Sequence, residues 1–281
     1  MTNSNPLAKY FRKATVYITL PTKGIFNPEL DMSALGDIGV MPMTALDEIA
    51  LRNPEALLNG EAMIDVIKSC VPSIPDPRKL CNIDIEALYL AIKYATDGKD
   101  IELQHKCAEC GETNNFSVDI DYILNRLPSY DTIPVVEHED IKIYIMPPTI
   151  GAYTKKSLIE LEQKRIVKDI NETIKNGEAK EEESAKRFYK SYLAIAQHNI
   201  DMLVDCIHHI ELPDQEIYDK TVIGEFLNNV DSSLVDKINK EAKALTRKPK
   251  EMTHMDITCP NCDAKSEKVL EVNPVNFSMA G

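Results

Sequence analysis

Two pairs of cysteines, far apart in the chain, constrain its fold more than any other feature. Cys107 and Cys110 stand near the middle of the 281 residues, and Cys259 and Cys262 stand near the end. Two residues separate the cysteines of each pair, a spacing at which a tight turn directs two thiolates at one tetrahedral metal ion. Neither pair fills four positions alone, so the sequence predicts one zinc site assembled from both.

The residues around each pair predict a strand on either side of the metal-binding turn. Gly111 and Asp263 directly follow the second cysteine of each pair, where a left-handed backbone would aim an N–H group at sulfur. The expected structure is a zinc ribbon whose halves are separated by a long insertion. Apolar residues alternate before and after both pairs, as in half-buried strands: Ile101, Leu103, Phe116, Val118, Ile120, Met255, Ile257, Leu270 and Val272.

The cysteine pattern leaves other interpretations open. A Cys-x-x-Cys pair also occurs in redox sites, in disulfides or by chance, and a thiol can be buried as a small apolar side chain. His105 and His254 are near enough to the pairs to replace a cysteine as ligand. Four thiolates leave no open position for water, which favours structural over catalytic zinc.

The composition excludes some classes of protein. Acidic residues outnumber basic ones by 45 to 32 and the net charge is −13, whereas nucleic-acid-binding domains usually carry a basic face. This balance disfavours nucleic acid and suits protein partners. No apolar run is long enough for a membrane span, and residues 1–8 lack the apolar segment of a signal peptide, which predicts a cytoplasmic site of synthesis. Seven cysteines, four of them in the two pairs, fit a reducing compartment.

Hydrophobic periodicity predicts an N-terminal part made of one strand and several helices. Thr44 and Asn82 stand where N-caps belong, at the starts of two of these helices. The link between residues 25 and 40 has no regular pattern. The expected elements are a strand over 15–20, helices over 45–51, 61–71 and 83–96, a helical turn over 122–127, and a hairpin of 133–136 with 141–146.

The region after residue 151 is expected to be mostly helical. The acidic run 177–184 is interpreted as a solvated turn or helix end, and Asp231 as an N-cap. Helices are expected over 152–175, 185–210, 222–229 and 232–245.

The fold class that follows is α+β: a small β-rich zinc-ribbon domain with N-terminal helices, interrupted by a mainly helical insertion. Residues 1–128 form the strand-helix region with the first half of the ribbon, and residues 129–251 form the hairpin and the helical insertion. Residues 252–281 form the second half of the ribbon and a C-terminal tail.

The sequence offers no catalytic residues. It has no phosphate-binding loop, dinucleotide fingerprint, nucleophile elbow or zinc-protease motif. His208 and His209 are adjacent, so on the expected helix they would point about 100° apart and could not share a metal ion. Asp119 and Asp121 share a strand face, but caps and solvated carboxylates are commoner than catalytic pairs. We therefore expect a protein that is not an enzyme.

The order of several short motifs resembles one protein family. The segment 15–26, TVYITLPTKGIF, resembles the opening "L-P-S-x-G-x-F" of the baseplate hub assembly chaperones and hub subunits of T-even-type contractile-tailed bacteriophages. Segment 40–48, VMPMTALDE, is similar to their next signature. No single motif is diagnostic, but their order is. The later matching segments are Asn53-Pro54, Cys107 to Gly111, Ile145 to Gly151, Cys259 to Cys262, and Asn273 to Phe277.

The resemblance covers residues 12–151 and about the last 25, and the helical insertion only loosely. The chain departs from the family in its longer N-terminal leader and in Cys81, which replaces a polar residue before a helix. The resemblance implies a hub protein or assembly chaperone that contacts other baseplate hub and tail proteins in the host cytoplasm. Such a protein either leaves after assembly or stays in the virion baseplate as a structural protein.

Two surfaces are expected to make these contacts. One is the exposed face of the helices over 185–245, and the other is the tail 272–281, where Phe277 is the one aromatic residue. Unchanged hub binding after removal of residues 275–281 would exclude the tail. The rival interpretation is a zinc ribbon that binds nucleic acid, for which the charge is unfavourable.

Overall fold

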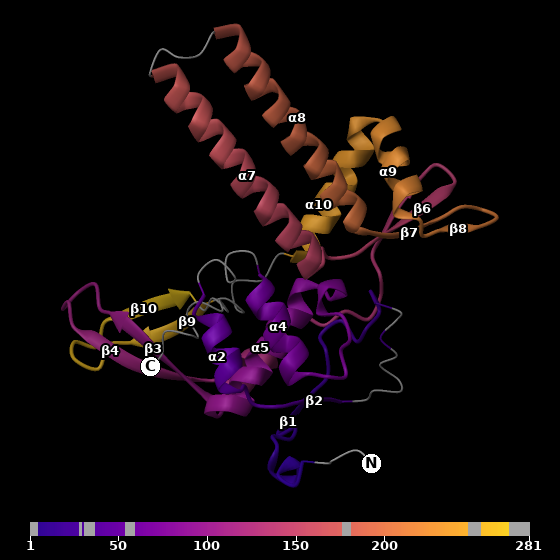
Figure 1. Cartoon of the computed structure of the whole chain (residues 1–281). Helices are drawn as coiled ribbons and strands as arrows, with labels where there is room; N and C mark the ends of the chain where they lie inside the picture. The colour runs from indigo at the N-terminus through magenta and orange to yellow at the C-terminus, as the bar shows by residue number, and fades with distance from the viewer. Residues whose placement is uncertain are drawn as a thin grey trace.

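The chain has an α+β fold with several small antiparallel sheets, as the sequence predicts. A computed structural model gives the structure of residues 5–27, 30, 37–53, 60–175, 181–246 and 254–269. In Figure 1 a helical N-terminal body lies in the lower half, a long helical hairpin projects above it, and strands from the middle and the end of the chain lie together at one side.

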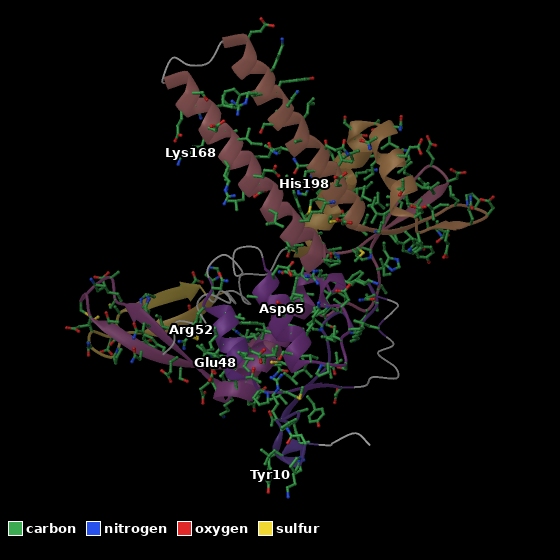
Figure 2. The ribbon with its side chains drawn as sticks, in the orientation of Figure 1. Tyr10, Glu48, Arg52, Asp65, Lys168 and His198 are labelled. Atoms are coloured by element: carbon green, nitrogen blue, oxygen red, sulfur yellow. The ribbon has the colours of Figure 1, made fainter. Side chains whose placement is uncertain are left out.

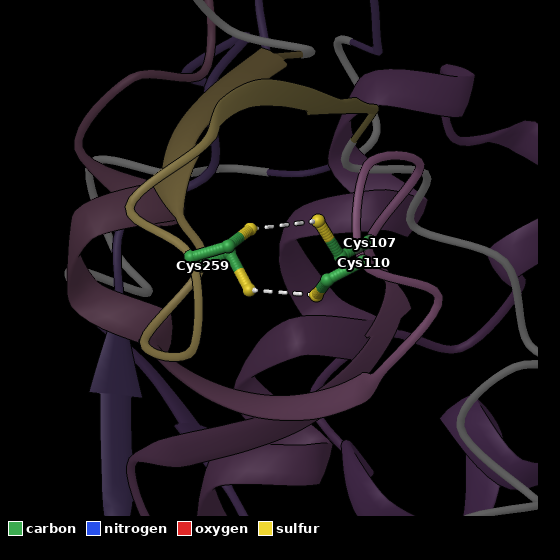
Figure 3. A group of neighbouring side chains, drawn as sticks. Cys107, Cys110 and Cys259 are labelled. Atoms are coloured by element: carbon green, nitrogen blue, oxygen red, sulfur yellow. Dashed lines mark hydrogen bonds between the residues drawn. The ribbon is translucent and has the colours of Figure 1, made fainter.

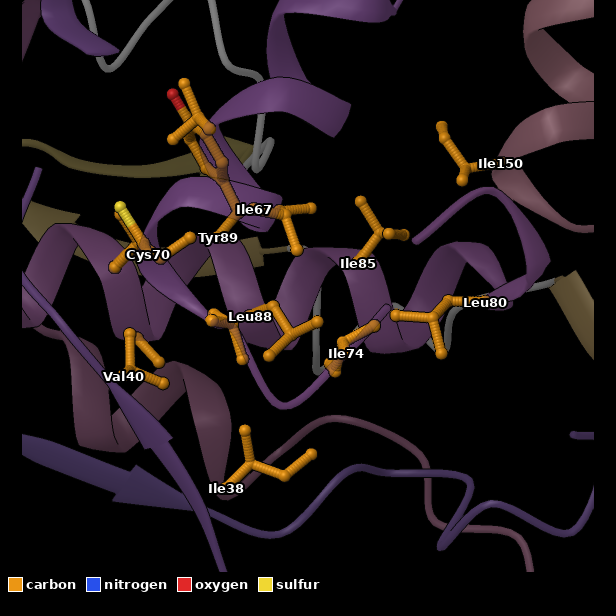
Figure 4. Packing of buried hydrophobic residues seen from close by; sticks show 14 of the residues in the cluster. Ile38, Val40, Ile67, Cys70, Ile74, Leu80, Ile85, Leu88, Tyr89 and Ile150 are labelled. Atoms are coloured by element: carbon orange, nitrogen blue, oxygen red, sulfur yellow. The ribbon is translucent and has the colours of Figure 1, made fainter. Parts of the chain in front are cut away.

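The N-terminal body consists of helices packed on a two-stranded sheet. Strands β1 and β2 are antiparallel, with Tyr17 opposite Gly39. Helix α5 lies at the centre of the largest core, where Ile85 and Leu88 are fully buried (Figure 4). Ile92 of the same helix is also fully buried. The elements of the N-terminal body are η1 (Ala8–Tyr10), β1 (Val16–Ile18), β2 (Ile38–Val40), α2 (Ala45–Leu51), α4 (Glu61–Cys70), η2 (Pro77–Lys79) and α5 (Asn82–Asp97).

Helix α2 begins where the sequence places its N-cap. The Thr44 hydroxyl accepts from the backbone N–H of Asp47, and the Asp47 carboxylate accepts from the backbone N–H of Thr44, which completes a capping box. The Arg12 guanidinium donates to the same Asp47 carboxylate and to the backbone oxygens of Pro42 and Ser69. Arg12 therefore ties the segment before β1 to the start of α2 and the end of α4.

A buried carboxylate joins the turn after β1 to α5. Asp84 is 2% exposed and accepts two hydrogen bonds from Thr22, one from the backbone N–H at 3.0 Å and one from the hydroxyl at 2.6 Å. Burial raises the pKa of Asp84 to about 6, although both hydrogen bonds act in the opposite direction. The turn that carries Thr22 is thereby held against the helix that organises the core.

Two hairpins form the ribbon. Strands β3 (Asp100–Lys106) and β4 (Thr113–Asp119) follow α5, with Leu103 opposite Phe116. Strands β9 (His254–Thr258) and β10 (Lys265–Val269) follow the insertion and pair in the same way. Helix α6 (Ile120–Leu124) ends the first hairpin and packs with Ile101, Val118 and Leu90 of α5 in a small core of its own.

The insertion contains a four-stranded sheet as well as helices. The strand order is β5-β6-β7-β8, all antiparallel. The end of α8, together with α9 and α10, buries one face of this sheet in a second core around Ile143, Ile207 and Ile238. The elements are β5 (Val135–His138), β6 (Ile141–Ile145), α7 (Ile150–Lys175), α8 (Glu181–Asp205), β7 (Ile207–Glu211), β8 (Glu216–Ile217), α9 (Lys220–Asn229) and α10 (Ser232–Thr246).

The expected helix over 185–210 is wrong at its C-terminal end. Helix α8 stops at Asp205, and Ile207–Glu211 is strand β7, which pairs with β6. The Lys220 ammonium donates to the backbone oxygens of Val204 and Ile207 at this end of the helix. Ile207 continues the helical spacing of Leu203 and Val204, which favours a helix in the sequence, but the segment pairs with the edge of β6 and is therefore a strand.

Smaller expectations also need correction. Cys81, and not Asn82, is the N-cap of α5, and Asn82 is its first helical residue. The helical turn expected over 122–127 runs from Ile120 to Leu124, because Asp119 caps it two residues earlier. The irregular link before residue 40 contains β2. Residues 181–184 of the acidic run are helical, while residues 177–180 and the tail 272–281 lie outside the described residues.

Substitution of Asp84 tests the buried link to Thr22. Asp84→Ala leaves the N–H and hydroxyl of Thr22 buried without their acceptor, so the free energy of unfolding should fall by about 2–3 kcal/mol in a urea titration. Asp65→Ala, on the exposed side of α4 (Figure 2), is the control and should change it by less than about 0.5 kcal/mol. Equal effects of both substitutions would contradict this role of Asp84.

Candidate metal centre

The two cysteine turns have the same backbone geometry. In the first, the N–H of Cys107 donates to Glu112 at 2.8 Å and the N–H of Gly111 donates to the oxygen of Cys107 at 3.0 Å. The second turn has the equivalent bonds. The N–H of Cys259 donates to the backbone oxygen of Ala264 at 2.9 Å, and the N–H of Asp263 donates to the backbone oxygen of Cys259 at 3.0 Å. Both turns therefore close a strand pair and present two sulfurs on one side.

The residue with a left-handed backbone conformation in each turn is the one that the sequence predicted. Gly111 has φ 75° and Asp263 has φ 55°. Glycine adopts this conformation without strain, and aspartate tolerates it better than most residues. The following backbone N–H groups, of Glu112 and Ala264, then donate to the sulfurs of Cys110 and Cys262.

The four sulfurs form one compact cluster. The Sγ atoms of Cys107 and Cys262 lie 3.7 Å apart, and so do those of Cys110 and Cys259 (Figure 3). All four lie within 4.8 Å of one another. In a tetrahedral site with Zn–S bonds of about 2.3 Å, neighbouring sulfurs are about 3.8 Å apart. The cluster therefore fits a single tetrahedral ion with four sulfur ligands.

The surroundings favour the thiolate form of Cys259, whereas desolvation and the neighbouring sulfurs raise the pKa of the Cys110 and Cys262 thiols. The backbone N–H groups of Asn261 and Cys262 donate to the sulfur of Cys259 and lower the pKa of its thiol to about 6. Cys107 and Cys259 are buried, whereas Cys110 and Cys262 are exposed. One edge of the cluster thus faces the ribbon and the other faces outward, as in a structural site at the tip of two hairpins.

Neither histidine proposed as a substitute ligand belongs to the cluster. The four cysteines are the one group of three or more His, Cys, Asp or Glu side chains that could hold a metal in the described part of the chain. His105 Nε2 lies 3.2 Å from the hydroxyl of Ser266, so this histidine joins β3 to β10. His254 lies at the start of β9.

Asn114 contacts the cysteine cluster, although the sequence did not predict it as a residue of this site. It is buried, and its side-chain nitrogen lies 3.3 Å from the sulfur of Cys259 on the other hairpin. The sequence contained a signal for this residue. Asn114, Phe116 and Val118 alternate along β4 and therefore share the face of the strand that points inward. A polar residue at an inward position needs a partner, and the Cys259 sulfur on the other hairpin is that partner here.

The remaining candidate residues from the sequence lie outside the cysteine cluster. Asp119 caps α6 by accepting from the backbone N–H of Asp121. His208 and His209 lie on β7, and a bulge against β6 brings their Nδ1 atoms to 2.7 Å from each other. The His209 ring stacks between Tyr144 and Tyr218. The expected 100° separation is thus wrong, because it assumed a helix.

A family model described as T4 bacteriophage base plate protein matches residues 37–277, which include both cysteine turns. No curated protein and no solved structure matches the chain. Among the residues that the structure describes, no helix is both long and apolar enough to cross a membrane.

The hydrogen bond across the hairpins predicts a specific effect on metal affinity. Asn114→Ala removes a donor to the Cys259 sulfur, and loss of such a partner typically weakens metal binding 10–100-fold. We expect at least a tenfold loss in competition with a zinc chelator. Asn115→Ala, the exposed neighbour on β4, is the matched control. Identical chelator curves for the two variants would show that Asn114 does not support the site.

Proposed function

The chain belongs to the family of T4 bacteriophage base plate proteins, and we propose that it serves the baseplate hub, as a hub subunit or as the chaperone that assembles the hub. The family match carries the baseplate part of this proposal. The hub part rests on the resemblance of residues 15–26 and 40–48 to hub assembly proteins. Its partners would be other hub and tail proteins of the phage.

The metal in this proposal is zinc, bound by Cys107, Cys110, Cys259 and Cys262. The sulfur separations support a tetrahedral ion with four thiolates, and this ligand set is typical of structural zinc. Four thiolates saturate the ion, so the protein would act through its surfaces and not by turnover. The zinc would hold the two hairpins together as a rigid end of the scaffold.

The nucleic-acid-binding alternative has less support. Its physical requirement is a basic surface that neutralises phosphates, and the net charge of −13 opposes it. Binding to duplex DNA that falls steeply with salt would favour this alternative over the hub proposal.

Metal analysis tests the zinc. We expect one zinc per chain in purified wild-type protein and substantially less in Cys259→Ser, together with a lower thermal midpoint. Thr258→Ser, one residue earlier and exposed on β9, keeps all four ligands and should retain the metal and the midpoint. No zinc in the wild type, or full zinc in Cys259→Ser, would refute a four-cysteine zinc site.

The location of the protein during assembly tests the hub role. Tails and tail-assembly intermediates from infected cells can be separated and analysed by mass spectrometry, with the tail tube protein as a control for recovery. A hub subunit should be present in both fractions, and a chaperone in hub intermediates alone. Absence from both fractions would contradict the proposal.

A further inference from the structure

His208 and His209 lie on β7 with their rings in contact, an arrangement that a regular strand does not allow. Successive side chains of a strand point to opposite faces of the sheet. The register between β6 and β7 shifts at Tyr144 and Ile145, and the Nδ1 atoms of the two histidines approach to 2.7 Å. At this distance the two nitrogens are hydrogen-bonded, so one ring carries a hydrogen on Nδ1 and the other does not.

The His209 ring is the middle member of a row of three stacked rings that crosses the sheet. Tyr144 of β6 lies on one side of it, with ring centroids 4.0 Å apart and planes 12° apart. Tyr218, the residue after β8, lies on the other side at 4.9 Å and 17°. His208 meets His209 and Tyr218 edge-on. Aromatic rings in such arrangements attract each other, so the row joins the end of β8 to the rest of the sheet.

Strand β8 depends on this row because its backbone pairing is short. It lies at the edge of the sheet (Figure 1). Among the strands that the structure describes, it pairs with β7 alone, at Ile210 opposite Ile217 and Glu211 opposite Glu216. The second pair places two carboxylates directly opposite each other, an arrangement that destabilises a sheet. The ring row therefore adds substantially to a pairing of two residues.

Charged groups face the histidine pair from β6, β7, β8, α8 and α9. Glu211 accepts from the Lys142 ammonium at 2.8 Å and from the Tyr144 hydroxyl at 2.5 Å. Glu216 accepts from the Tyr218 hydroxyl at 2.7 Å. The titratable groups around the pair are Lys142 and Tyr144 of β6, Glu211 of β7, Glu216 of β8, Tyr218, Lys220 of α9, and Asp205 and Cys206, which act on Lys220.

These surroundings hold both histidines in the neutral form while the sheet is intact. Burial, the neighbouring His209 and the Lys220 ammonium lower the pKa of His208, and Glu216 acts in the opposite direction. Burial lowers the pKa of His209, which Glu216 and Glu211 offset only in part. An exposed histidine has a pKa of about 6.5, so both rings bind protons more tightly once their contact opens. Opening therefore becomes more favourable as the pH falls below about 6.5.

We propose that His208 and His209 form a proton-controlled latch, which holds β8 on the sheet while the two Nδ1 atoms share one hydrogen and releases it when both carry one. Two N–H groups cannot point at each other across 2.7 Å, so a second Nδ1 hydrogen separates the rings. His209 then leaves its place between Tyr144 and Tyr218, and β8 loses its ring contact with the sheet. Its release uncovers the edge of β7, and an uncovered strand edge pairs readily with another strand.

Hydrogen exchange of the full-length, zinc-loaded chain, followed by mass spectrometry, tests the latch. The peptide 210–218 covers the pairing of β7 with β8. The peptide 234–245 of α10, in the same sample, corrects for the direct effect of pH on exchange. If the rings bind protons only in the open form, opening is about 100-fold more favourable at about pH 5.5 than at about pH 7.5, with about tenfold from each histidine. We expect the protection of peptide 210–218, relative to peptide 234–245, to fall by up to this factor.

His209→Phe separates the proton from the ring stack, because phenylalanine keeps a ring between the two tyrosines and binds no proton. In this variant β8 should stay protected, and the change with pH should shrink to less than about tenfold. His138→Gln, on β5 of the same sheet, removes a histidine outside the pair and should keep the wild-type profile. Circular dichroism and zinc content at each pH establish that the variants are folded.

Nitrogen-15 NMR of the histidine rings tests the hydrogen bond without any substitution. At neutral pH one ring of the pair should carry its hydrogen on Nδ1 and the other on Nε2. Two rings with the same tautomer would overturn the proposal. So would a peptide 210–218 whose relative protection does not fall with pH, or a wild-type pH profile in His209→Phe.

Discussion

The contact between the two cysteine turns governs how the rest of the chain is arranged, because it joins residues 155 positions apart. Whatever lies between the turns must leave the ribbon and return to it. Loop closure costs free energy that rises only slowly with loop length, so a metal ion bound by all four cysteines would close a long insertion at little more cost than a short one. The insertion is consequently free to form a hydrophobic core of its own, around Ile143 and Ile207.

The two cores meet at a small junction. Met146 of the strand region packs with Phe26, Cys81 and Ile83 of the N-terminal body. The Tyr130 hydroxyl donates to the backbone oxygen of Leu245 at the end of α10, so it joins the start of the insertion to its end. With the ribbon, these contacts give a scaffold from which the α7–α8 arm projects, and such a shape suits a protein that works by contact with others.

The sequence predicted the elements whose signals are local. Thr44 and Asp47 sit one helical turn apart and cap α2 wherever it packs, and Gly111 shapes its turn without help from the rest of the fold. The four cysteines were predicted to converge because two ligands cannot complete a tetrahedral site. The prediction failed at Ile207–Glu211, where Ile207 continues the helical spacing of the preceding apolar residues but the segment pairs as a strand with β6. It also missed Asn114, whose partner is on a distant hairpin.

The sequence by itself determined which residues form turns, which cap helices and which cysteines are paired for one site, since each of these properties depends on a side chain and its nearest neighbours. Only the tertiary structure decided that β7 pairs with β6, that the bulge there brings His208 to His209, and that Asn114 reaches Cys259. It also decided which sides of α7 and α8 remain uncovered. The physical reason is that pairing and burial are properties of two surfaces together, and the second surface lies far away in the sequence.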